Sequence, residues 1–281
     1  MGRTSVTLGG VQLNSTVTNA SGPRSATREE LVELSGAHRG AVVFKSCNPG
    51  GLESPDNLKN PGVDYYAALA RELGPKGTVV WGSVVGVTED EIIDVARKLD
   101  RAGAKIIELN LADDFVANSV GPFKSTDRLR ALLKRVRGEV SAVLAVKVPP
   151  SVPRDQAGAI AAVFKETGVA VAVCANDLPK GLEFDLAKAT VKAPAGPLSQ
   201  THAFYLAGGG ALDVVAVGGV ASGSEAYLAH LTGAKAVQVG SALIKEGAGA
   251  LARIDRELDA LLADNGKASV GEIVGQIRFA D

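Results

Sequence analysis

VAVGGVASGSEA at residues 215–226 and VQVGSALIKEG at residues 237–247 share one plan. Each begins with an apolar, β-branched run, turns at Gly-Gly or Gly-Ser, and continues into the start of a helix. An apolar run without alternation is typical of a parallel strand that is covered on both faces. Two such strand–turn–helix units in succession predict βαβ architecture in this part of the chain.

Further apolar runs extend this plan toward the N-terminus, and helical patterns separate them. Capping residues mark the helices, as in the Thr-x-x-Glu box that opens TREELVELSGA. The predicted strands cover residues 16–21, 40–46, 78–86, 105–112, 142–148, 169–176, 212–219 and 236–243. The predicted helices cover residues 27–37, 88–103, 125–138, 154–168 and 222–234. This alternation, unbroken by any linker, predicts an α/β fold, a (β/α)₈ TIM barrel forming one domain over residues 1–281.

Composition excludes several classes of protein. The formal net charge of −1 offers no broad basic field for nucleic acid. No run reaches the roughly 18 apolar residues of a membrane span, and the start MGRTSVTLGG lacks the apolar core of a signal peptide. Cys47 and Cys174 form no C-x-x-C pair and no disulfide framework. We therefore expect a cytoplasmic protein that binds neither nucleic acid nor membrane.

Three long irregular stretches, 46–62, 112–125 and 177–200, each follow a predicted strand. Loops that follow the strands of a barrel form the face where active sites are built. The alternative is that they are ordinary surface loops.

The paired turns at the end of the series predict a phosphate site. In (β/α)₈ barrels a phosphate often binds after strands seven and eight, where glycine lets the backbone approach the anion and helix N-termini donate N–H groups. The residues in that position are Gly218, Gly219, Gly240 and Ser241. The alternative is that these glycines serve only close packing of helix on strand.

Polar residues stand at the ends of several apolar strands. Lys45 in VVFKS and Lys147 in LAVKVPP are candidates to point into the site, or else to extend past the apolar surface to solvent. Three strand-end amides, Asn19, Asn110 and Asn176, offer donors and acceptors in one plane. Singly such amides are more often cap residues, but together they favour recognition of a flavin or cyclic imide edge, with Asn60 as a fourth.

Acidic residues follow the fourth predicted strand. Asp113 and Asp114 could accept a proton or hold a cation, or be solvated loop acids. The three histidines have no ligand spacing, so we expect no metal site. Cys174, inside an apolar strand, is expected to be core.

At this point the chain resembles the class 1 dihydroorotate dehydrogenases along nearly its whole length. The matching segments occur in the family's order and spacing: TNASG (18–22), FKS (44–46), NPGVDYY (60–66), ELNL (108–111), VKVPP (146–150), the Asn of CAND (174–177), and the two stretches quoted first.

The resemblance implies an FMN-binding barrel that oxidises dihydroorotate. It implies that Ala20, Ser21 and Gly22 line the flavin, that Lys45 contacts flavin and substrate, and that Lys147 and Asn110 contact the flavin ring. Gly218, Gly219, Gly240 and Ser241 match the residues that bind the FMN phosphate, and Asn60, Asn110 and Asn176 match those that hydrogen-bond the substrate ring.

The chain departs from the family pattern on the substrate side. Where the family reads Ser-Cys-Pro-Asn after ELNL, this chain reads Ala-Asp-Asp-Phe, so Asp113 replaces the catalytic base and Phe115 replaces a substrate amide. Asp177 replaces a serine beside Asn176 and would repel an anionic carboxylate. A free aspartate, with a pKa of about 3.9, is a weak base unless its surroundings raise that pKa.

The sequence therefore predicts an FMN-dependent oxidoreductase that moves a hydride between flavin N5 and a small polar, dihydropyrimidine-like substrate. Asp113 and Lys45 are its candidate catalytic residues, and Asp177 joins the amides on the substrate side. The electron acceptor is open, and family analogy favours a homodimer. Three alternatives remain: an authentic dihydroorotate dehydrogenase of pyrimidine biosynthesis, a flavin-binding homologue without catalysis, and an isomerase or aldolase with Lys147 as a Schiff-base lysine.

Overall fold

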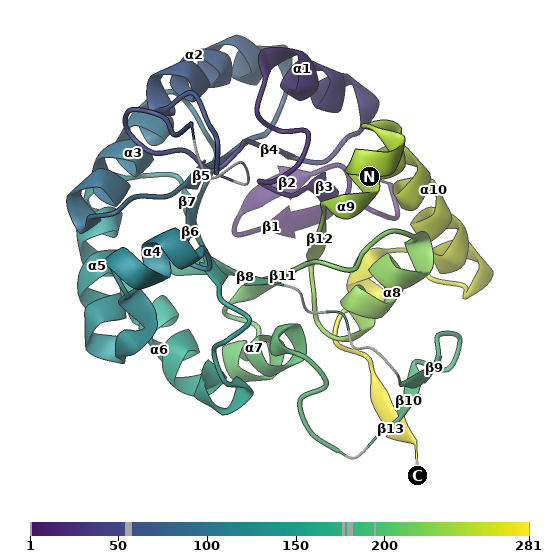
Figure 1. Ribbon diagram of the computed structural model, residues 1–281. Coiled ribbons are helices and arrows are strands. Elements are labelled where there is room, and N and C mark those ends of the chain that lie inside the picture. Colours follow the sequence, from purple (N-terminus) through teal and green to yellow (C-terminus); the bar gives the residue numbers. More distant parts are fainter. Residues whose placement is uncertain (1, 54–57, 176–177, 179–181, 194, 281) are drawn as a thin grey trace.

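The computed structural model describes residues 2–53, 58–175, 178, 182–193 and 195–280. Eight parallel strands form one sheet in the order β3-β12-β11-β8-β7-β6-β5-β4, curled into a barrel inside a ring of helices (Figure 1). The barrel strands are β3 (Val17–Asn19), β4 (Val42–Val43), β5 (Val80–Val84), β6 (Ile106–Asn110), β7 (Val143–Val148), β8 (Val169–Ala175), β11 (Asp213–Val217) and β12 (Ala236–Val239). All eight predicted strands are confirmed, and the fold is the predicted (β/α)₈ barrel.

The helices lie outside the sheet. They are α1 (Arg28–Ala37), α2 (Val63–Leu73), α3 (Glu89–Arg101), α5 (Thr126–Glu139), α6 (Ala157–Thr167), α7 (Gln200–Gly208), α8 (Gly223–Leu231) and α10 (Gly249–Asp264), with two short helices, α4 (Asp114–Ser119) and α9 (Ser241–Glu246). Four 3₁₀ turns are η1 (Gly74–Lys76), η2 (Pro122–Lys124), η3 (Arg154–Gln156) and η4 (Val270–Glu272). The capping box predicted at Thr27 and Glu30 is present, whereas α2, α7 and α10 were not predicted.

The seam between β3 and β4 is closed by a side chain. Asn19 donates from Nδ2 to the carbonyl of Val43 at 2.6 Å, and its Oδ1 accepts from the Val43 N–H at 2.9 Å. The carboxamide thereby takes the place of a peptide group in the ladder. The prediction that Asn19 belongs to a ligand-binding edge is wrong, because both of its polar atoms are used in closing the barrel.

An antiparallel hairpin, β1 (Val6–Leu8) and β2 (Val11–Leu13), lies at the end of the barrel where the strands begin. Its two-residue turn is Gly9-Gly10, both with positive φ, as two-residue hairpin turns require. Leu8 and Leu13 are fully buried and pack with Trp81, Ile106, Val171 and other inward-facing strand residues. The lower interior of the barrel is therefore filled and apolar.

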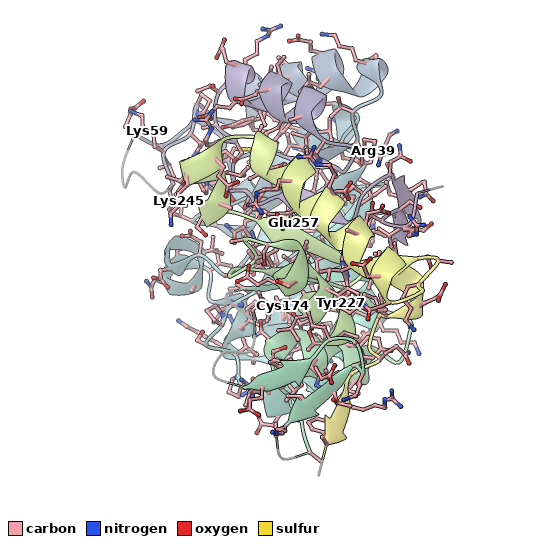
Figure 2. All side chains as sticks on the ribbon, turned by 90° about the vertical axis from the view of Figure 1, so that its right-hand side faces the viewer. Arg39, Lys59, Cys174, Tyr227, Lys245 and Glu257 are labelled. Atoms are coloured by element: carbon pink, nitrogen blue, oxygen red, sulfur yellow. The ribbon has the colours of Figure 1, made fainter. Side chains whose placement is uncertain are left out.

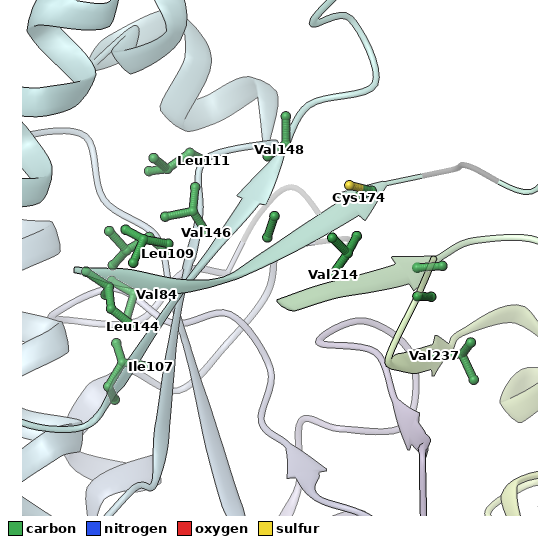
Figure 3. Close-up of a cluster of buried hydrophobic side chains, with 14 of the residues drawn as sticks. Val84, Ile107, Leu109, Leu111, Leu144, Val146, Val148, Cys174, Val214 and Val237 are labelled. Carbon is green, nitrogen blue, oxygen red and sulfur yellow. The ribbon is translucent and has the colours of Figure 1, made fainter. Parts of the chain in front are cut away.

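The outward-facing strand residues pack under the helices. Val84, Leu109, Val146 and Cys174 belong to this outer core, which Figure 3 shows in close-up. Cys174 is core, as predicted.

The stretch 177–200, predicted to be irregular, contains two short strands. β9 (Glu183–Asp185) pairs antiparallel with β10 (Thr190–Lys192), which pairs in parallel with β13 (Arg278–Ala280). This small sheet lies outside the helix ring (Figure 1). The expectation of an irregular loop is wrong there, because β9 and β10 pair locally and β10 gains a second partner, β13, from far along the chain.

Candidate functional site

Polar side chains replace apolar ones at the upper end of the barrel interior, which we call the mouth because the strands end there. Strand alternation explains the change, since every second residue faces inward. On β6 the inward series runs Ile106, Glu108, Asn110, and on β7 it runs Ala145, Lys147. In side view, Lys59 and Lys245, from segments that follow strands, lie at one end of the molecule, while Arg39, which precedes β4, lies at the other (Figure 2).

A buried ion pair occupies the mouth. Lys147 Nζ lies 2.7 Å from Glu108 Oε1, and the side chains are 9% and 0% exposed. Lys147 also donates to Ser21 Oγ at 3.0 Å. The lysine is therefore neither exposed nor extended to solvent, and its position places Ser21 of the predicted flavin segment beside β7.

Asn110 is joined to the same cluster through two serines. Its Nδ2 donates to Ser46 Oγ at 3.0 Å, Ser46 and Ser83 lie 2.8 Å apart, and Ser83 Oγ donates to Glu108 Oε1 at 3.3 Å. Lys147 and Asn110, predicted separately, thus belong to one hydrogen-bonded cluster.

Lys45 and Asp113 lie within electrostatic reach of each other at the mouth. Burial lowers the pKa of Lys45, the carboxylate of Asp113 opposes that shift, and the ammonium of Lys147 adds to it. Lys45 is only 7% exposed. Three predicted residues from three different βα units therefore converge, as the strand order requires.

A cavity of about 560 Å³ opens beside Lys45. Its lining combines apolar groups with charged ones and includes Gly22, Arg24, Lys45, Asn60 and Tyr65. Asn60 is 4% exposed, and its carboxamide also orders its own loop, since Nδ2 donates to Leu58 O at 2.8 Å and Oδ1 accepts from Gly62 N at 3.0 Å. One N–H of the amide is left for another acceptor.

The two glycine turns lie side by side, because β11 and β12 are paired with Val217 opposite Gln238. Gly218 and Gly219 have φ of +98° and +86°, which favours glycine. A Cβ on Gly240 would meet only Ala20 Cβ, at 3.8 Å, so the turn after β12 has space above it. The first N–H groups of α9 at Ser241 have no acceptor within the helix.

Several predicted residues are described only in part. Asn176 and Asp177 lie outside the described residues, and of Phe115 only the backbone, in α4, is described. Among the described residues no group of three or more His, Cys, Asp or Glu could hold a metal ion. No helix in the described part of the chain is both long and apolar enough for a membrane span.

The histidines lie apart from this cluster, and the side chain of Cys47, although next to Ser46, packs in the outer core. Burial lowers the pKa of His230 to about 4, and its ring contacts Thr16 Oγ and Ala234 O. Burial also raises the pKa of the Cys47 thiol. These groups stay neutral and fill structural positions.

Sequence reasoning missed Glu108, Ser83 and Gln238. A signal was present, because a glutamate inside IIELN and a glutamine inside AVQV interrupt otherwise apolar strands. Such residues are fully buried only when they have partners.

Comparison with known proteins places these features in a family. The family model described as dihydroorotate dehydrogenase matches residues 56–262. The chain is 28% identical to the "Probable dihydroorotate dehydrogenase A (fumarate)" of Streptococcus pneumoniae, over 99% of each chain. It is 28% identical to the "Dihydroorotate dehydrogenase (fumarate)" of Saccharomyces cerevisiae, over 92% of this chain and 93% of that protein.

Solved structures share the fold. The ligand-free DHODH of Eimeria tenella superimposes with a TM-score of 0.82 at 19% identity, covering 98% of this chain and 92% of that one. The same protein in complex with ferulenol gives 0.79 at 18% identity, with coverage of 97% and 88%.

Proposed function

Because this chain belongs to the dihydroorotate dehydrogenase family, we propose that it moves a hydride between a small polar, dihydropyrimidine-like substrate and FMN held across the mouth of the barrel. The chain is an FMN-dependent oxidoreductase that acts on CH–CH groups. The residues that bind and the substrate they select are the proposal.

The residues at the mouth fit FMN. A Cβ on Gly240 would contact only Ala20, so there is open space above this glycine. That space suits close approach of a phosphate to backbone N–H groups. Ala20, Ser21 and Gly22 follow β3 beside that turn. Lys147 and Asn110 offer a cation and an amide, both nearly buried, for the polar edge of the ring.

The substrate is proposed to occupy the cavity beside Lys45, with Asn60 directed to its polar edge. FMN, when bound, supplies the hydride acceptor at N5. Asp113 accepts the proton that leaves the neighbouring substrate carbon, and Lys45 orients the substrate within electrostatic reach of Asp113. Asn176 and Asp177 are proposed on the same side.

The departures at Asp113, Phe115 and Asp177 support a substrate other than dihydroorotate. Loss of a buried amide partner weakens recognition by about 1–3 kcal/mol, and an added acid repels a carboxylate. The relatives' names give fumarate as their electron acceptor, so fumarate is the first acceptor to test. Dihydroorotate itself is the second candidate, since relatives named for it cover nearly the whole chain.

The convergence of Lys45, Lys147 and Asp113 at one mouth is the observation that carries the proposal. It argues against Lys147 as a Schiff-base lysine, because its Nζ is already engaged by the buried Glu108 carboxylate at 2.7 Å and by Ser21 Oγ at 3.0 Å.

Purified protein is expected to be yellow and to release FMN on denaturation. An anaerobic screen should then compare dihydroorotate with dihydropyrimidines that lack its carboxylate, following loss of the flavin's visible absorption. Bleaching by the latter alone supports an altered substrate, and bleaching by dihydroorotate with reoxidation by fumarate supports the second candidate. Folded protein that neither contains nor takes up FMN would overturn the proposal.

A further inference from the structure

Glu108 lies at the centre of the mouth cluster and is completely buried. Lys147 Nζ at 2.7 Å, Ser83 Oγ at 3.3 Å and Ser21 Oγ at 3.5 Å all donate to its Oε1. Gln238 Nε2 donates to its Oε2 at 3.0 Å. Four side chains from four different segments thus meet on one carboxylate.

The direction of these hydrogen bonds is fixed by chemistry. Ammonium and amide nitrogens only donate, so Glu108 accepts from Lys147 at Oε1 and from Gln238 at Oε2. Ser83 and Ser21 each use their proton on Glu108, so the single proton of Ser46 goes to Ser83 at 2.8 Å or to Ser21 at 3.3 Å, and Ser46 accepts from Asn110. Both proposed ring contacts, Lys147 directly and Asn110 through two hydroxyls, are therefore anchored on Glu108.

Stability alone gives no reason for a charge at this place. A buried ion pair is seldom better for stability than apolar residues of similar volume. The barrel itself shows the alternative one layer below, where Trp81, Ile106, Val171 and Val215 fill the interior without any charge. Among the described residues, the charged side chains that are buried, Lys45, Glu108 and Lys147, lie in the layer that faces the mouth.

We propose that Glu108 is a positioning residue that fixes the Lys147 ammonium against the polar edge of the flavin ring. This rests on the proposed function, in which FMN lies against Lys147. Glu108 does not itself touch the ring. Its effect on the flavin is transmitted through Lys147, and removing it should resemble removing Lys147.

The test measures two properties of the holoenzyme, the dissociation constant of FMN and the midpoint potential of the bound flavin. The variants are Glu108→Gln, Lys147→Met, the double variant and Glu108→Asp, with the exposed Glu166→Gln as control. Glu166 is also an ion-paired glutamate, with Lys134 at 2.7 Å. The double variant leaves neither charge unpaired, so it keeps the proposal testable if Glu108→Gln folds poorly.

Glu108→Gln and Lys147→Met should each weaken FMN binding about tenfold or more, and both should lower the midpoint potential because the anionic reduced ring loses its fixed cation. The double variant should match Lys147→Met alone, and Glu108→Asp should lie between Glu108→Gln and the parent. Glu166→Gln should change neither property.

Other outcomes overturn the inference in distinguishable ways. A higher potential in Glu108→Gln would mean that the carboxylate acts on the ring directly, and additive losses in the double variant would mean that it acts independently of Lys147. Unchanged FMN binding and potential in Glu108→Gln, with both altered in Lys147→Met, would leave a structural role only. If Lys147→Met also changes neither, the flavin does not lie against Lys147, and the proposed placement of FMN fails together with this inference.

Discussion

The two walls of the mouth are built differently. One wall consists of strand residues, Asn110 and Lys147, which are nearly buried and tied to Glu108 through direct or serine-mediated hydrogen bonds. The other consists of loop residues that follow the strands, Asp113 among them. The strand wall keeps the pattern of the family, and the loop wall departs from it.

The difference has a physical cause. A residue on the strand wall is held by the ladder, by its neighbours in the interior and by several hydrogen bonds at once, so a change there disturbs many contacts. A loop residue at the mouth can change without altering the barrel beneath it. Under the proposed function, substrate choice would be set at the loop wall while FMN is held at the strand wall.

Asp113→Asn is expected to separate the two walls most clearly, because it should reduce turnover without changing FMN content. Turnover should fall by about 10²–10⁴-fold, because an amide cannot take the substrate proton, while the FMN content of the purified protein stays unchanged. Asp114→Asn, which alters the exposed neighbour, is the control and should retain activity. Equal turnover in Asp113→Asn would remove Asp113 from the mechanism.

Gly240→Ala tests the proposed phosphate site, and it should affect FMN binding and not the folded structure. The added Cβ would lie 3.8 Å from Ala20 Cβ and meet nothing else within 4 Å, so the melting temperature should hold. FMN affinity should fall about 10–100-fold, since the methyl group enters the space assigned to the phosphate. Gly138→Ala, on α5 with nothing within 4 Å of its Cβ, is the matched control. Full FMN affinity in Gly240→Ala would move the phosphate elsewhere.

Phe115→Asn restores the amide that the family has at this position, two residues after Asp113. If the departure at this position disfavours dihydroorotate, the variant should bind it about tenfold more tightly, the value of one buried hydrogen bond. Phe115→Leu keeps the position apolar and should give no gain. The measurement is the KM for dihydroorotate in the two variants, with flavin absorbance as a check that both retain FMN.

The pH dependence of substrate binding is expected to be the smallest effect. Burial lowers the pKa of Lys45 below its ordinary 10.5, so its positive charge is lost at a lower pH than that of an exposed lysine. Binding of an electron-rich substrate edge should therefore weaken several-fold in the alkaline range. Lys45→Arg keeps the charge at those pH values and should flatten the profile. A profile unaltered by that substitution would assign the titration to another group.

Much of the scaffold could be predicted because its signals are local. Continuous apolar runs predict the parallel strands, and the capping pair of Thr27 and Glu30 predicts a helix start. Local signals were also present, and missed, in α10, where Leu251, Ile254, Leu258 and Leu262 recur at helical spacing. The turn Gly9-Gly10 between two short apolar segments likewise indicates the hairpin.

The remaining features depend on distant partners. β10 forms a sheet with β13 from the C-terminal segment, and no pattern in residues 190–192 reveals that pairing. Glu108 gathers Ser21, Lys147 and Gln238 only once the register of the strands is known. The family pattern supplied Lys45, Asn110 and Lys147 as separate contacts, and the structure joins them into one arrangement.

The seam closed by the Asn19 side chain is the place in the barrel where we expect local opening to be easiest. Elsewhere neighbouring strands are joined by runs of backbone pairs, whereas β3, β4 and the segments that follow them are joined by the Asn19 carboxamide and by the bonds from Lys45 N to Ser25 O and from Ser46 N to Ser21 O. Amide hydrogen exchange at Val43 should accordingly outpace exchange at Ile107 or Val146. Ser21 and Lys45 lie on either side of this seam. Local opening there would widen the mouth beside them while the other seven strand pairs stay hydrogen-bonded.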